Sequence, residues 1–160
     1  MDIVATYPLE WGNGSTTTLT GSLNYNREQF ETDPSAVLNA ETQYDFENFE
    51  PNWRGVFTAR HDVEALTLVG RVSWYGEYTN SNTGGDPLRF QTFDDIFFFD
   101  LEAQYQVNDM FKVSLGGRNL FDEYPETDAI SDYCCGRLYS SGTAVDWQGS
   151  YFYGRISADF

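Results

Sequence analysis

Basic residues are scarce in this chain of 160 residues: nine Lys and Arg stand against 25 Asp and Glu, for a formal net charge of −16. Proteins that bind nucleic acid neutralise phosphates with clusters of Lys and Arg. The chain has no such cluster, so we expect no nucleic-acid partner. Disorder is also disfavoured, because acidic disordered chains have few aromatic residues and this chain has 18%.

Histidine and cysteine are rare as well. His61 is the only histidine, which excludes paired-histidine catalysis and most zinc sites within the chain. Cys134 and Cys135 are adjacent and cannot link distant elements, so we interpret them as two thiols in a surface loop. No nucleophile–base set or phosphate-binding loop is present. We therefore expect no enzyme activity, no catalytic residues, no cofactor and no metal site.

Acidic residues of the connecting segments match no EF-hand spacing and are more simply explained as solvated loops than as Ca²⁺ ligands. These residues are Asp86, Asp94, Asp95, Asp128 and Asp132.

Long apolar runs are missing. The longest, Ile96 to Phe99, ends at Asp100, far short of the roughly 18 residues that a transmembrane helix needs. The N-terminus also lacks the charged and then apolar pattern of a signal peptide.

The dominant pattern is instead an alternation of period two, which predicts β-strands. In the segment 97–107, Phe97, Phe99, Leu101 and Tyr105 fall on one face and the acidic and amide residues fall on the other. Similar alternation predicts seven strands and no convincing helix. The predicted strands are 3–11, 19–25, 53–63, 66–78, 97–107, 111–121 and 147–160.

The connections between these strands alternate in length. Short turns are expected at 12–15, 64–65 and 108–110, and long loops at 31–52, 79–96 and 124–146. In an up-and-down antiparallel meander, all the short turns would lie at one end of the sheet. Long strands, one apolar face and alternating loop lengths are typical of an outer-membrane β-barrel, whose apolar face meets lipid.

A second fold has the same period. A soluble carbohydrate-binding β-sandwich also alternates, but its apolar faces turn inward, so the period alone leaves both folds open. In the barrel, the polar face would line the lumen and aromatic residues near strand ends would lie at the membrane interfaces. The polar face contains Arg54, Arg60, Arg71, Glu102, Arg118 and Arg155; the strand-end aromatics are Trp11, Trp53, Trp74, Tyr78, Phe97, Phe111 and Phe121.

Three short sequences resemble segments of TonB-dependent outer-membrane receptors. Asn119-Leu120-Phe121-Asp122 resembles the motif on the penultimate strand of that family. The segment 153–160 resembles its closing strand, and the segment 2–9 is similar to one of its internal strands. The resemblance spans nearly the whole chain.

The resemblance implies a fold and a function. The fold is the C-terminal part, residues 1–160, of a 22-stranded barrel filled by a plug domain. The function is import of a ferric siderophore, haem, cobalamin or oligosaccharide across the outer membrane of a Gram-negative bacterium. The implied partners are outer-membrane lipid, the TonB complex acting through the plug, the barrel-assembly machinery and a small-molecule ligand. The chain shows no plug, no TonB box and no signal peptide, so we expect it to be a truncated or split receptor.

Two sets of site residues follow. Phe160, with Ile156 and Gly154 on the same face of the last strand, resembles the signal that the assembly machinery reads. Aromatic residues in or beside the long loops are candidates for ligand contact, although packing between the loops explains them equally well. These candidates are Phe90, Phe93, Tyr133, Tyr139 and Trp147.

Overall fold

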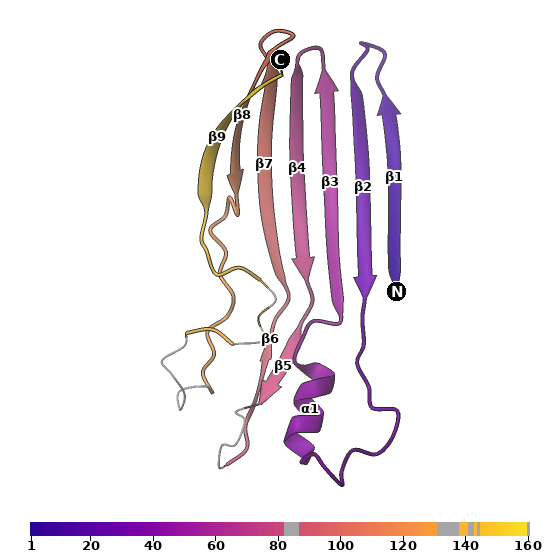
Figure 1. Cartoon of the computed structure of the whole chain (residues 1–160), viewed down its shortest axis with the longest axis vertical. Helices are drawn as coiled ribbons and strands as arrows, with labels where there is room; N and C mark the ends of the chain where they lie inside the picture. Colours follow the sequence, from indigo (N-terminus) through magenta and orange to yellow (C-terminus); the bar gives the residue numbers. More distant parts are fainter. Residues whose placement is uncertain (82–86, 131–137, 141–142, 144, 160) are drawn as a thin grey trace.

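The computed structural model describes residues 1–81, 87–130, 138–140, 143 and 145–159. These residues form an antiparallel sheet of seven strands in the order β1-β2-β3-β4-β7-β8-β9 (Figure 1). Each strand pairs with its neighbour along the meander, so the predicted all-β, up-and-down topology is confirmed. The strands are β1 (Asp2–Glu10), β2 (Thr16–Tyr25), β3 (Trp53–Val63), β4 (Leu66–Tyr75), β7 (Ile96–Gln106), β8 (Phe111–Arg118) and β9 (Tyr151–Ala158).

The three short turns share one rim of the sheet, as the loop lengths predicted, and the long connections gather at the opposite rim (Figure 1). Local hydrogen bonds explain the tight turns. The Asn108 side-chain oxygen accepts from the backbone N–H groups of Met110 and Phe111 at 2.9 and 2.8 Å, and Asn13 accepts from the Ser15 N–H at 3.1 Å. Asn side chains commonly cap turns in this way.

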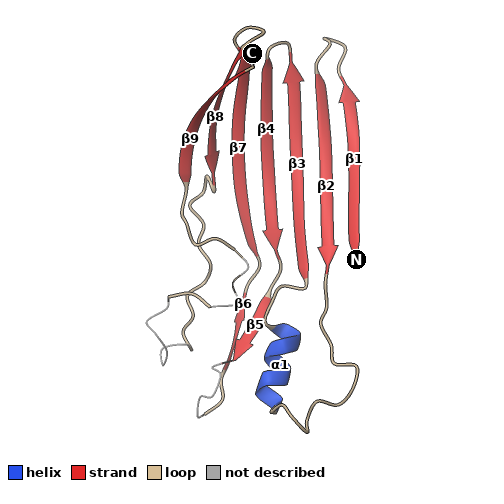
Figure 2. Cartoon of the chain, viewed as in Figure 1, coloured by secondary structure: helices blue, strands red, loops and turns tan. Residues whose placement is uncertain are grey.

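The prediction of no helix was wrong. The long connection after β2 contains the helix α1 (Ala40–Asn48) (Figure 2). Its N-terminus is capped by Asn39, whose side-chain oxygen accepts from the Thr42 N–H at 2.8 Å. The helix has no buried residue, so the apolar stripe that usually reveals a helix in a sequence is absent. The Asn cap and the acidic Glu41 in the first turn were the available signals.

A separate two-stranded ribbon lies within the next long connection, between β4 and β7. It consists of β5 (Tyr78–Ser81) and β6 (Phe90–Phe93) (Figure 2). The strand predicted over 66–78 is therefore divided, because β4 ends at Tyr75 and Tyr78 belongs to the ribbon.

Two other predicted boundaries move inward. The predicted strand 111–121 ends at Arg118, since Asn119 takes a φ of 48° that no strand accommodates. The last strand starts at Tyr151 rather than at 147.

The strand register places apolar residues of neighbouring strands on one face of the sheet and polar residues on the other. Leu101 of β7 pairs with Gly70 on one side and Gly117 on the other, and Gly117 pairs with Phe152. One position along, Glu102 pairs with Val69 and Gly116. The sheet therefore has one continuous apolar face and one mainly polar face, as the alternation predicted.

The apolar face is exposed. Leu101, Leu115, Phe152 and Ile156 are 51%, 65%, 75% and 75% exposed. Among the described residues, the buried apolar side chains are Phe93 and Ile130, both outside the seven-stranded sheet. The sheet thus has no packed core of its own on either face.

No helix within the described part of the chain is both long enough and apolar enough to cross a membrane.

Candidate functional site

A hydrogen-bonded network occupies the polar face of β7, β8 and β9. The Tyr153 hydroxyl donates to one Glu102 oxygen, and Gln104 Nε2 donates to the other. Arg155 also reaches Glu102, with Nη2 at 3.1 Å from Oε2. Gly116 pairs with both Glu102 and Tyr153, and a Cβ added there would collide with the Tyr153 ring. Glycine is therefore required for the tyrosine to cross β8.

This network forms part of the wall of a groove of about 530 Å³ on the polar face. Arg71 of β4 and Arg118 of β8 line the same groove, with Asp100 between them. The guanidinium group of Arg118 lies 5.9 Å from the ring centre of Tyr151, within the range of a cation–π contact. The predicted lumen-facing set is thus brought together on one face, and Arg71, Arg118 and Arg155 share one hollow.

The motif Asn119–Asp122 forms a tight turn at the rim with the long loops. Asn119 and Asp122 both adopt positive φ, 48° and 58°, which Asn and Asp tolerate better than most residues. The Asn119 side chain accepts from the Glu123 N–H at 2.9 Å and donates to the Glu123 carbonyl at 2.8 Å. The Leu120 N–H donates to the Phe99 carbonyl at 2.8 Å, which ties the turn to β7.

The same turn also holds the start of β9. Asp122 Oδ1 accepts from the Ser150 N–H at 2.7 Å and from the Tyr124 hydroxyl at 3.2 Å. The backbone of Gly149 lies close to the side chains of Tyr124 and Asp122, and a Cβ added at Gly149 would collide with both. The motif residues therefore have a structural role: they link β7, β8 and the approach to β9.

The aromatic candidates separate into packing and exposed residues. Phe93 is 2% exposed and stacks on Tyr78, its partner across the ribbon, with ring centres 4.7 Å apart, so it packs within the ribbon. Phe90 is 48% exposed and meets Tyr44 of α1 edge-on. Trp147 is 59% exposed and stacks with Tyr139 at 6.3 Å. Tyr133 lies outside the described residues.

Two of the three residues predicted to form the assembly signal lie on the last strand, β9. Ile156 pairs with Val113 and Gly154 pairs with Leu115, so both belong to the exposed apolar face. Phe160 lies outside the described residues.

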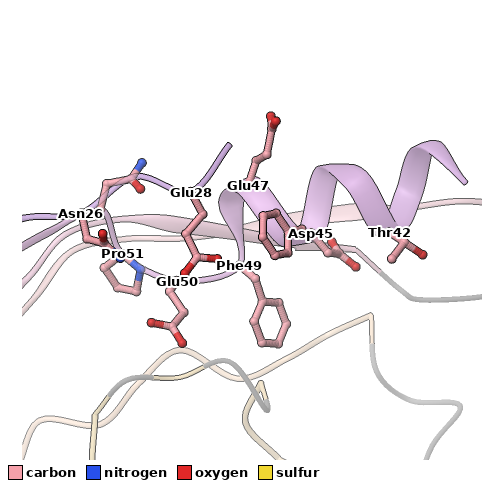
Figure 3. A pocket seen from close by; sticks show the side chains of 10 residues that line it. Asn26, Glu28, Thr42, Asp45, Glu47, Phe49, Glu50 and Pro51 are labelled. Atoms are coloured by element: carbon pink, nitrogen blue, oxygen red, sulfur yellow. The ribbon is translucent and has the colours of Figure 1, made fainter. Parts of the chain in front are cut away.

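A second hollow, of about 350 Å³, lies between α1 and the segments before and after it (Figure 3). Phe46, Phe49 and Pro51 are its apolar lining residues, and Glu28, Asp45, Glu47 and Glu50 are its acidic lining residues. The sequence did not indicate this hollow, because it depends on the helix that the periodicity missed.

Gln91 was also missed. This β6 residue donates through Nε2 to the Thr127 carbonyl at 2.9 Å and accepts from the Ala129 N–H at 2.8 Å. It thereby ties the ribbon to the last long connection. Nothing in the sequence marks Gln91, since its partners are 36 and 38 residues away.

Comparisons of the chain with protein-family models, with curated proteins and with solved structures found no match.

Proposed function

We propose that the chain forms seven strands of an outer-membrane β-barrel that binds and imports a scarce small molecule, in the manner of a TonB-dependent receptor. The observation that carries this proposal is the orientation of the sheet faces. Leucine, phenylalanine and isoleucine side chains lie on an exposed face, and charged groups bond to one another on the opposite face. Lipid contact stabilises such an apolar face, whereas water does not.

The distribution of loops supports the same function. Three tight turns lie at one rim, and α1, the ribbon β5–β6 and the last long connection lie at the other (Figure 1). Outer-membrane barrels have short periplasmic turns and long extracellular loops. The rim that carries Phe90, Tyr139 and Trp147 would then face the outside of the cell, where an imported ligand first binds.

The two unpaired edges of the sheet are the evidence for a larger assembly. The outer edges of β1 and β9 have no strand partner among the described residues, and unpaired backbone groups are strongly unfavourable in lipid. We propose that further strands close a 22-stranded barrel, that a plug domain links it to the TonB complex, and that β9 is recognised by the barrel-assembly machinery.

The β-sandwich alternative has less support. A sandwich buries the apolar faces of two sheets against each other. The described residues form one large sheet and one two-stranded ribbon, and the apolar face of the large sheet is exposed. No observation favours carbohydrate binding by a soluble domain.

Cysteine labelling in the native cell tests the membrane orientation. Cys134 and Cys135 are first replaced by serine, and single cysteines are then placed at Val37 in a long connection or at Asn13 in a short turn. An impermeant maleimide should label Val37→Cys in intact cells and Asn13→Cys only after the outer membrane is permeabilised. Equal labelling of both positions in intact cells, or recovery of the protein in a soluble fraction, would overturn the proposal.

Ligand uptake tests the transport role. Shortening the loop from Tyr124 to Asp146, while keeping the Asn119–Asp122 turn intact, should weaken binding and uptake at limiting ligand without reducing the amount of protein in the outer membrane. The matched control shortens the β1–β2 turn at 12–15, which lies at the opposite rim. Unchanged uptake of ferric siderophore, haem, cobalamin and oligosaccharide would contradict the proposal that this loop contacts the ligand.

A further inference from the structure

Three arginines converge on the polar groove although the chain as a whole is strongly acidic. Arg71, Arg118 and Arg155 come from β4, β8 and β9 and line the same hollow. The strand register explains this convergence. Arg71 of β4 pairs with Asp100 of β7. Because Leu101 of β7 pairs with Gly117 of β8, the next residue of β8, Arg118, lies beside Asp100 on the other side of β7. The groove therefore holds three guanidinium groups against two carboxylates, within a chain whose formal net charge is −16.

Both carboxylates in the groove already have partners. Glu102 accepts from Tyr153, Gln104 and Arg155. Asp100 Oδ1 accepts from the Asn119 N–H at 3.0 Å, which orients it toward the rim turn.

Arg71 and Arg118 have no ion-pair partner within the described part of the chain. The ion pairs found there are Arg54–Glu50, Arg60–Asp62 and Arg155–Glu102. In a chain with nearly three acidic residues for each basic one, two neighbouring arginines that form no direct ion pair with any described carboxylate are unexpected. Their donors are available to an anion from outside the chain.

We propose that this groove binds a small anionic solute through Arg71 and Arg118, at carboxylate or phosphate groups. A guanidinium group offers paired N–H donors that match these oxyanions. The groove volume of about 530 Å³ lies within the range of small-molecule sites, roughly 300–1,000 Å³. Arg155 is held by Glu102 and shapes the wall, while the rings of Tyr151 and Tyr153 form the side nearest β9.

This inference rests on the proposed function, because only in a barrel does the polar face of the sheet line a lumen. It adds to that function the charge of the imported solute, which would be negative. An anion that enters from the long-loop rim would pass the turn at Asn119 before it meets Arg118. The groove would then be a second contact on the import route, below the aromatic residues of the loops.

Calorimetry on the full-length protein, purified in detergent micelles at low ionic strength, provides the test. The probes are inorganic phosphate and succinate, and choline is the cationic control. We expect both anions to bind and choline not to bind. The double variant Arg71→Gln/Arg118→Gln should lose roughly tenfold or more in affinity, because each arginine gives charged hydrogen bonds.

Arg60→Gln is the matched control. Arg60 lies on the same face but pairs with Asp62 at 2.7 Å and does not line the groove, so its removal should leave anion affinity unchanged. Protection from phenylglyoxal is a second measurement that needs no variant: phosphate should slow modification of Arg71 and Arg118 but not of Arg60.

Absence of anion binding to the unaltered protein, or equal losses in Arg60→Gln and the double variant, would overturn the inference. Its failure is distinguishable from failure of the proposed function. Loss of anion binding with the correct cysteine-labelling pattern rejects only the groove, whereas a wrong labelling pattern rejects the membrane barrel itself.

Discussion

The Tyr153 hydroxyl of β9 donates a hydrogen bond to Glu102 of β7 across the backbone of Gly116 on the strand between them. The ring covers a glycine that has no side chain to exclude water. Aromatic cover of a strand glycine is a known way of pinning strand register. Three consecutive strands are thus fixed by one pair of side chains on the polar face.

Gly116→Ala should destabilise the sheet, because the added Cβ would collide with the Tyr153 ring. Overpacking of this kind costs about 1–3 kcal/mol. Gly70→Ala is the control, since a Cβ there meets no atom within 4 Å. Urea unfolding of the detergent-solubilised protein, followed by tyrosine and tryptophan fluorescence, measures both variants. Equal stability of the two would contradict the close approach at Gly116.

The two faces of the sheet should respond differently to a new charge. In the proposed barrel, Leu101→Arg or Leu115→Arg, on the exposed apolar face, should destabilise the protein in lipid by about 2–4 kcal/mol near the bilayer midplane. Gln104 lies on the polar face beside Glu102. The substitution Gln104→Arg should therefore lower the stability in lipid much less. Folding equilibria in lipid vesicles measure the difference, and similar losses at all three positions would mean that the faces are assigned wrongly.

Asn119→Ala should loosen the rim turn for two reasons. Alanine disfavours the φ of 48°, and the variant loses both hydrogen bonds between the side chain and the Glu123 backbone. We expect a loss of about 1–3 kcal/mol and faster proteolysis after residue 119. Asn119→Gly separates the two causes, because it keeps the backbone angle and loses only the bonds. A proteolysis rate equal to that of the unaltered protein in both variants would show that the turn does not depend on Asn119.

Tyr78 should make stability fall at high pH. Burial raises the pKa of its hydroxyl above the ordinary value of 10.0, and hydrogen bonds to Thr143 and Ser140 partly oppose this. The folded state then holds the proton more tightly than the unfolded state does. Its contribution to stability is therefore complete below pH 10 and is lost as the pH rises through the folded-state pKa.

Denaturant midpoints at pH 8 and at several values above pH 10 measure this dependence. Tyr78→Phe has no phenol proton to lose and should show a shallower decline than the unaltered protein. A decline in Tyr78→Phe as steep as in the unaltered protein would assign the effect to other groups.

The sequence predicted the parts of the fold that depend on neighbouring residues. Alternation in 97–107 located β7 to within one residue at each end. Successive side chains of a strand point to opposite faces of the sheet, so a strand with one apolar face shows apolar residues at every second position of its sequence. Loop lengths predicted that the turns near Asn13, Glu64 and Asp109 share one rim. The helix α1 was missed because its contacts are made with the ribbon, through Asp45 and the Ser81 N–H at 2.9 Å and through Tyr44 and Phe90.

Sequence alone therefore determined the strands, their order and the division into an apolar and a polar face, since each of these follows from spacing along the chain. It could not decide whether a second layer of the chain covers the apolar face, because a sandwich and a barrel share the same alternation; among the described residues no such layer covers Leu115 and Phe152, which are 65% and 75% exposed. Nor could it bring Arg71, Arg118 and Arg155 into one groove. That grouping depends on the register of three successive strand pairs, which brings Arg71 and Arg155 to one groove although they are 84 positions apart in the chain, and no local pattern encodes it.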